Sequence, residues 1–173
     1  MPRNINFERL SLQDALDLAI MIEEEAAERY EELAAQMEVH HTPEAAQFFH
    51  FMVKNETKHG EELTERRKQL FGDAPRNVDS SMVWEVEAPE YEKVRVFMTA
   101  QDALAVALQS EEKAYRFFES AVKYVKDADV LKLFEELKQE EIEHQQLVKK
   151  ELSKLPEDSK VDVSDYADEP VAQ

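Results

Sequence analysis

The chain carries an internal repeat with an offset of 88 residues, and this repeat constrains the fold more than any other feature. Nine of 22 residues are identical between positions 13–34 and 101–122. Duplication of a helical hairpin leaves a repeat of this kind, because each copy is one supersecondary unit that packs against the next. The sequence therefore predicts two similar hairpins, each made of two helices.

Local start and stop signals predict where these helices begin and end. Ser11 and Thr99 are each followed three residues later by Asp, which is the pattern of a capping box at a helix start. Thr42 before Pro43 marks the start of a second helix, and Gly72 marks its end. The predicted hairpins are 11–39 with 43–71 and 99–126 with 128–155.

The scarcity of turn residues supports an all-α fold. Only two Gly and six Pro occur in 173 residues. Short connections within each hairpin and a long segment, 73–98, between the hairpins predict an antiparallel four-helix bundle. The long segment would cross the bundle between the second and third helices. We expect one domain over residues 1–155 and a flexible acidic tail over 156–173.

Polar residues interrupt the apolar seam that each helix of such a bundle needs. Apolar side chains recur alternately four and three positions apart along each predicted helix, as in helices that pack in a bundle. The first and third helices are interrupted by one Glu at repeat-equivalent positions, and the second and fourth by a Glu-x-x-His pair. These residues are Glu23, Glu111, Glu56 with His59, and Glu141 with His144.

Four facing carboxylates in a bundle core require compensation, because desolvation and mutual repulsion both oppose their ionisation. Two divalent cations would balance their charge. The chain has no Cys, so thiolate zinc sites and iron–sulfur clusters are excluded. Carboxylate and imidazole ligands favour iron or manganese, with zinc as another occupant. We therefore predict that the six residues hold a pair of metal ions.

Other glutamates lie beside these positions and are expected to form solvated faces. They are Glu24, Glu25, Glu28, Glu31, Glu32, Glu112, Glu119, Glu136 and Glu140. A misjudged register is the alternative for a single Glu on a seam, and a satisfied core residue is the alternative for a single His.

The motifs resemble those of the rubrerythrin or erythrin branch of the ferritin-like di-iron carboxylate superfamily, over about residues 10–155. They read Glu23-Glu-Glu-Ala-x-x-x-Tyr30 with Glu56-Thr-Lys-His59, and Glu111-Glu-Lys-Ala-x-x-x-Phe118 with Glu141-Ile-Glu-His144. The resemblance implies a ferritin-like bundle with two iron ions. Glu56 and Glu141 would bridge the ions, Glu23 and Glu111 would be terminal ligands, and each His would complete one ion.

The resemblance also gives Tyr30 a role, as a hydrogen-bond donor to a ligand carboxylate; a core Tyr is the alternative. The sequence departs from the family in three ways. The cysteines of a rubredoxin domain are missing, so electrons would come from a separate donor protein or from substrate iron. Ala114 stands where some relatives carry a second carboxylate, and Phe118 replaces the Tyr expected by symmetry with Tyr30.

The resemblance implies a di-iron oxidoreductase that oxidises Fe(II) with hydrogen peroxide or dioxygen, in oxidative-stress protection and iron handling. Two alternatives stay open. The first is an iron-binding protein that sequesters or delivers iron with little turnover. The second is a purely structural bundle that binds no stoichiometric metal.

Charge and hydropathy limit the partners. The 39 acidic and 21 basic residues give a net charge of −18, which disfavours nucleic acid and anionic membrane surfaces. No apolar run approaches the roughly 20 residues that span a bilayer, and no targeting segment is recognisable. We expect a cytoplasmic protein, and the resemblance implies a homodimer, with exchange of hairpins between subunits left open.

Overall fold

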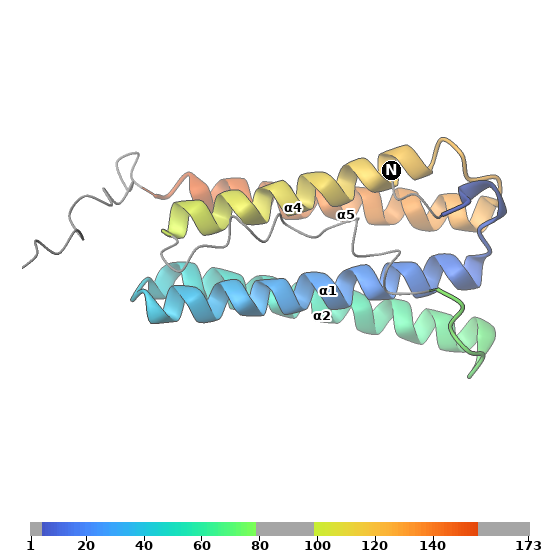
Figure 1. Cartoon of the computed structure of the whole chain (residues 1–173), viewed down its shortest axis with the longest axis horizontal. Helices are drawn as coiled ribbons and strands as arrows, with labels where there is room; N and C mark the ends of the chain where they lie inside the picture. The colour runs from blue at the N-terminus through green and yellow to red at the C-terminus, as the bar shows by residue number, and fades with distance from the viewer. Residues whose placement is uncertain (1–4, 79–98, 156–173) are drawn as a thin grey trace, which may run out of the picture.

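The computed structural model describes residues 5–78 and 99–155, and within these ranges the chain is helical without strands. Its elements are η1 (Phe7–Arg9), α1 (Leu12–Val39), α2 (Pro43–Phe71), α4 (Ala100–Ala121) and α5 (Ala128–Leu152). The α1–α2 hairpin lies alongside the α4–α5 hairpin, with all four long helices along the longest axis of the molecule (Figure 1). The predicted all-α four-helix bundle is therefore confirmed. Most of the predicted crossover and the acidic tail lie outside the described residues.

The helix starts follow the capping signals of the sequence. Thr99 and Asp102 form a complete capping box, in which each side chain bonds a backbone amide of the other residue. At the start of α5, the Asp127 carboxylate accepts bonds from two backbone amides. Thr42 stands before Pro43 as predicted, but its hydroxyl donates to the carbonyl of Met37, at 3.0 Å, instead of capping α2.

The helix ends differ more from the sequence-based prediction. Gly72 ends α2 with a φ of 59°, a conformation that favours glycine, as the sequence predicted. By contrast, α4 ends at Ala121, not near residue 126. The amides of Tyr124 and Val125 both bond the carbonyl of Ala121, at 2.9 and 3.1 Å, so the backbone tightens into a turn there. This stretch has no Gly or Pro to signal the end.

Two apolar clusters fill the bundle, one on either side of a layer of buried carboxylates. The first cluster includes Phe7, Leu63, Phe117 and Phe134. The second includes Tyr30, Phe49, Met52, Leu104 and Val148. On each long helix, a buried Glu lies between residues of the two clusters. Burial of each large apolar side chain contributes about 1.5–3 kcal/mol, so both clusters hold the intervening layer in place.

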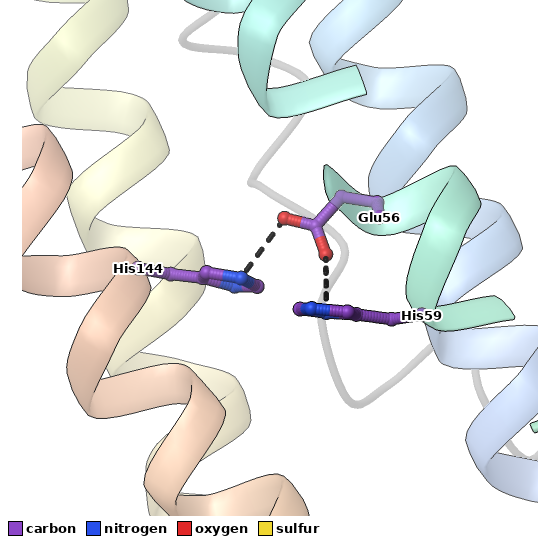
Figure 2. A group of neighbouring side chains, drawn as sticks. All are labelled: Glu56, His59 and His144. Atoms are coloured by element: carbon purple, nitrogen blue, oxygen red, sulfur yellow. Dashed lines mark ion pairs between the residues drawn. The ribbon is translucent and has the colours of Figure 1, made fainter. Parts of the chain in front are cut away.

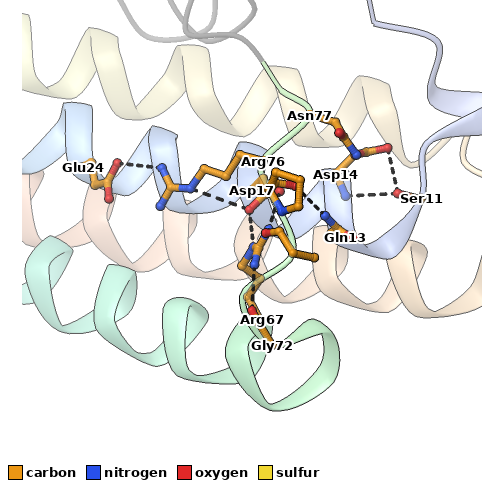
Figure 3. A network of polar contacts seen from close by, with 11 residues as sticks. Ser11, Gln13, Asp14, Asp17, Glu24, Arg67, Gly72, Arg76 and Asn77 are labelled. Atoms are coloured by element: carbon orange, nitrogen blue, oxygen red, sulfur yellow. Dashed lines mark hydrogen bonds and ion pairs between the residues drawn. The ribbon is translucent and has the colours of Figure 1, made fainter.

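A buried ion pair joins α1 to the end of α2. The guanidinium of Arg67 donates to both carboxylate oxygens of Asp17, which is fully buried, and to the carbonyl oxygens of Gly72 and Ala74 (Figure 3). Arg76 lies 3.8 Å from Asp17 on the same side. One acid of α1 thus fixes the chain where it leaves α2.

This ion pair also shifts the buried face of α2. The alternating spacing of four and three residues, continued from Glu56 and His59, predicts Arg66 and Leu70 on the buried face, but Arg67 is buried instead and Leu70 is 55% exposed. The reason is the buried Asp17, which requires a cationic partner at this depth. The spacing of apolar residues along α2 does not reveal this ion pair, because Asp17 lies on α1.

The first residues after α2 lie along α1. The amide of Gln13 donates to the carbonyl of Pro75 at 3.0 Å, and Asn77 donates to Asp14 at 3.4 Å (Figure 3).

Among the helices of the described ranges, none is long and apolar enough to cross a membrane.

Candidate metal centre

The six predicted ligand residues converge from all four long helices. Two overlapping groups of potential ligand atoms contain five of them, and the atoms of each group lie within 4.8 Å of one another. These groups are Glu56, His59 and His144, and Glu111, Glu141 and His144. Glu23 joins through His59, whose Nδ1 lies 4.0 Å from its Oε2. The structure therefore brings all six side chains to one layer of the bundle.

Glu56 lies between the two histidines. Its Oε1 is 3.3 Å from Nδ1 of His144, and its Oε2 is 4.0 Å from Nδ1 of His59 (Figure 2). The two imidazole rings are stacked, with centroids 5.3 Å apart and planes 9° from parallel. One carboxylate thus presents one oxygen to each of two neighbouring positions, the arrangement expected of a bridging ligand.

The His144 end of the centre is closed. Glu111, Glu141 and His144 are exposed by only 1%, 5% and 5%. Nδ1 of His144 lies 3.3 Å from Oε2 of Glu111. The hydroxyl of Tyr30 donates a hydrogen bond to the other oxygen of Glu111. Tyr30 therefore occupies the position that the resemblance implied, in contact with a predicted ligand carboxylate.

Burial and charge set the protonation of this end. Burial raises the pKa of Tyr30 well above its usual value, and the nearby carboxylates of Glu111 and Glu56 raise it further, so the phenol keeps its proton and donates. Burial alone would raise the pKa of Glu111, but bonds from His144, Glu141 and Tyr30 outweigh it and lower that pKa. Although burial opposes it, the bond to Glu111 raises the pKa of His144.

The His59 end is more open and titrates differently. The His59 side chain is 21% exposed, against 6% for His144. Burial, followed by the charge of His144, lowers the pKa of His59, so its ring is neutral near pH 7. Its Nδ1 has no contact with solvent and no hydrogen-bond partner among the described residues.

One carboxylate at this end was not predicted. Glu140, which was assigned to a solvated face, has a carboxylate oxygen within 4.8 Å of ligand atoms of Glu23 and His59. Its position off the apolar seam concealed it. The available signal was its spacing, because Glu140 lies four residues before His144 and therefore on the same side of the helix.

A glycine allows α1 and α2 to approach beside Glu23. Gly60 is buried, and a Cβ atom built on it would lie 3.6 Å from Cβ of Glu23. The missing side chain leaves the backbone of α2 close to this predicted ligand. Gly60 therefore contributes to the position of Glu23 without carrying a donor atom.

The donor set fits a pair of metal ions. Four buried carboxylates face two imidazole nitrogens, and Nδ1 of the neutral His59 is buried without a hydrogen bond. A cation supplies what these groups lack, since it takes the imidazole lone pair and balances the carboxylate charge. Glu56 has an oxygen toward each histidine; in a loaded centre, Glu23 and His59 would hold one ion, and Glu111, Glu141 and His144 would hold the other.

Comparison with known proteins gives two matches. A family model described as Rubrerythrin matches residues 14–152, a range that contains every residue of the candidate centre. The crystal structure of an uncharacterised conserved protein from Magnetospirillum magnetotacticum MS-1 is 31% identical, with a TM-score of 0.70. The match covers 85% of this chain and 97% of that chain, and it supports the ferritin-like fold. No curated protein matches the chain.

Proposed function

Because this chain belongs to the rubrerythrin family, and is thus a non-haem iron protein, we propose that it oxidises Fe(II) with hydrogen peroxide or dioxygen. The position of Glu56 carries the proposal. One carboxylate with an oxygen toward each histidine supports two metal positions side by side. Reduction of hydrogen peroxide to water takes two electrons, and two neighbouring ferrous ions would supply one each.

The iron pair would supply the redox chemistry: two ferrous ions, one hydrogen peroxide and two protons give two ferric ions and two waters. The protein residues hold and tune this pair. Glu56 and Glu141 keep the two positions together, and the hydroxyl of Tyr30 fixes the Glu111 carboxylate in one orientation. The apolar clusters on both sides keep water from the carboxylate layer. The partly exposed side chain of His59 marks where small reactants reach the centre.

The histidine ends differ, and this supports two ions with different tasks. His144 is closed in and lies at hydrogen-bond distance from two carboxylates. His59 is more exposed and neutral. The ion at the His59 end would meet reactants from solution, whereas the ion at the His144 end would stay fixed.

Stopped-flow oxidation of Fe(II)-loaded protein tests the proposal. The wild type should oxidise Fe(II) at least about 100-fold faster than the Glu56→Ala, Glu141→Ala double variant, because preorganised charge at a reacting centre contributes on that order. A matched control replaces two exposed acids of the same helices, Glu61→Ala with Glu143→Ala, and should keep the wild-type rate. Equal rates in the wild type and the first double variant would overturn the proposal.

An iron-binding protein with little turnover is the second candidate. Ala114 favours it, because this residue is fully buried one turn beyond Glu111, where some relatives carry a further carboxylate. The electrons for re-reduction of a ferric pair are expected to come from a donor protein or from substrate iron. This candidate predicts tight binding of two Fe(II) ions and oxidation no faster than in free solution.

The expected homodimer is tested by light scattering of the purified protein.

A further inference from the structure

The two ends of the metal centre are built from different residues. At the His144 end, Glu111 of α4 and Glu141 of α5 form a group of potential ligand atoms with His144. At the His59 end, the group consists of Glu23, His59 and Glu140. The internal repeat alone would give both ends the same donor set, so Glu140 breaks the symmetry of the centre.

Glu140 reaches the His59 end because of its place on α5. Successive residues on an α-helix point about 100° apart, since one turn takes 3.6 residues. Glu141 faces the middle of the carboxylate layer, so Glu140 points to one side of it. That side is occupied by α2 and His59, and atoms of Glu140, His59 and Glu23 lie within 4.8 Å of one another.

Within residues 5–78 and 99–155, no lysine or arginine forms an ion pair with Glu140. On α5, Lys132 pairs with Glu136 and Lys138 pairs with Glu135. The charged side chains that act on Glu140 are instead His144 and three acids, Glu62, Glu136 and Glu143. A carboxylate that is half-buried among acids gains from a nearby cation.

Helix α4 supplies no second carboxylate one turn beyond Glu111. The residue there is Ala114, which is fully buried and carries no donor atom. Glu140 brings a carboxylate to the centre from α5 instead.

We propose that Glu140 is a seventh ligand of the centre and binds the ion held by Glu23 and His59. This inference rests on the proposed dimetal site. It makes the two ions unequal: the ion at the His144 end has buried ligands only, and the ion at the His59 end has an added, partly exposed carboxylate. Loss of Glu140 should therefore weaken one ion and leave the other unchanged.

Anaerobic titration with Fe(II) against a competing chelator tests this role. The test variant is Glu140→Gln, which keeps the size of the side chain and removes its charge. The matched control is Glu143→Gln, which makes the same change three residues along α5 at an exposed position outside the ligand groups. Metal-free circular dichroism of both variants checks that the bundle folds. Mössbauer spectra of the proteins loaded with ⁵⁷Fe(II) report the two ions separately.

We expect Glu140→Gln to bind one of two ions about tenfold or more weakly, since loss of even an indirect partner of a metal costs 10–100-fold in affinity. One of the two iron signals should change, and Glu143→Gln should match the wild type. Wild-type binding of both ions by Glu140→Gln would overturn the role of Glu140. Equal loss of Fe(II) affinity in Glu143→Gln would also overturn it, because the loss would then reflect the reduced negative charge of the protein and not a ligand.

The titration and the stopped-flow measurement together separate this inference from the proposed function. Suppose that the wild type binds two ions, that Glu140→Gln binds one of them more weakly, and that the wild type oxidises Fe(II) no faster than free solution. Glu140 is then a ligand, but the oxidase function is wrong. If the wild type binds fewer than two ions, both the proposed function and the role of Glu140 are wrong.

Discussion

The hydroxyl of Tyr30 on α1 donates a hydrogen bond to the carboxylate of Glu111 on α4, across 81 residues of sequence. Both side chains are 1% exposed. The bond therefore joins the two hairpins at the level of the candidate metal centre. It fixes the orientation of the Glu111 carboxylate, a predicted metal ligand, in the absence of metal.

Replacement of this tyrosine should weaken the metal-free protein. Tyr30→Phe removes the donor to a buried carboxylate, and we expect a loss of about 1–3 kcal/mol in the free energy of unfolding. Urea denaturation of the metal-free protein measures it. Tyr115→Phe is the control, because the hydroxyl of Tyr115 bonds Glu119 at 3.1 Å on a more exposed face, where the loss should stay below about 0.5 kcal/mol. Equal losses in the two variants would contradict the role of the buried bond.

Gly60 should accept a methyl group but not a larger side chain. Gly60→Ala adds a Cβ at 3.6 Å from Cβ of Glu23, an ordinary contact distance, and removes a glycine from a helix interior. We expect a gain of about 0.5–1 kcal/mol in the free energy of unfolding. Gly60→Leu should instead displace Glu23 and weaken metal binding. Thermal unfolding and Fe(II) titration measure the two effects; wild-type metal affinity in Gly60→Leu would count against the close packing.

Two adjacent arginines should differ sharply in their effect on stability. Arg67→Ala leaves the buried carboxylate of Asp17 without its guanidinium and should lower the urea midpoint clearly. Arg66→Ala breaks a pair with Glu136 whose side chains are 35% and 44% exposed, and such pairs contribute about 0–1 kcal/mol. Urea denaturation of both variants gives the comparison. A midpoint as low in Arg66→Ala as in Arg67→Ala would mean that burial of the pair is unimportant.

Divalent metal should stabilise the bundle. Mn(II), which avoids oxidation during the measurement, should raise the unfolding temperature by roughly 5–10 °C at a hundredfold excess over the dissociation constant, and EDTA should reverse the rise. The physical reason is that the ions bind the folded arrangement of carboxylates and not the unfolded chain. The Glu56→Ala, Glu141→Ala variant serves as the control and should show no rise. An equal rise in that variant would place the stabilising metal elsewhere.

Much of the fold follows from local sequence signals. The capping box at Thr99 and the glycine after α2 mark helix boundaries through the hydrogen bonds that they make, and the structure places them as predicted. The end of α4 at Ala121 was missed, because the turn that follows is made by backbone bonds between ordinary residues.

The candidate centre was predictable to the extent that its residues lie on apolar seams. Glu23 and Glu111 were distinguished from the glutamates beside them by register, and both are buried. Glu140 lies off the seam, and it meets His59 only because α2 and α5 face each other at that height. Arg67 was also missed, since its partner Asp17 lies on another helix. Contacts between helices depend on rotation and tilt, which a single helix does not encode.

The carboxylate layer between the two apolar clusters should reverse the usual gradient of helix flexibility in the metal-free protein. Helices ordinarily loosen from their ends, where backbone bonds are incomplete. Here each long helix is held by apolar packing on both sides of the centre, while its midpoint carries a charged group facing other charges. In the metal-free chain, amide exchange should therefore be fast at mid-helix relative to the flanking turns. The predicted ligands therefore lie where the backbone of the metal-free protein should open most readily.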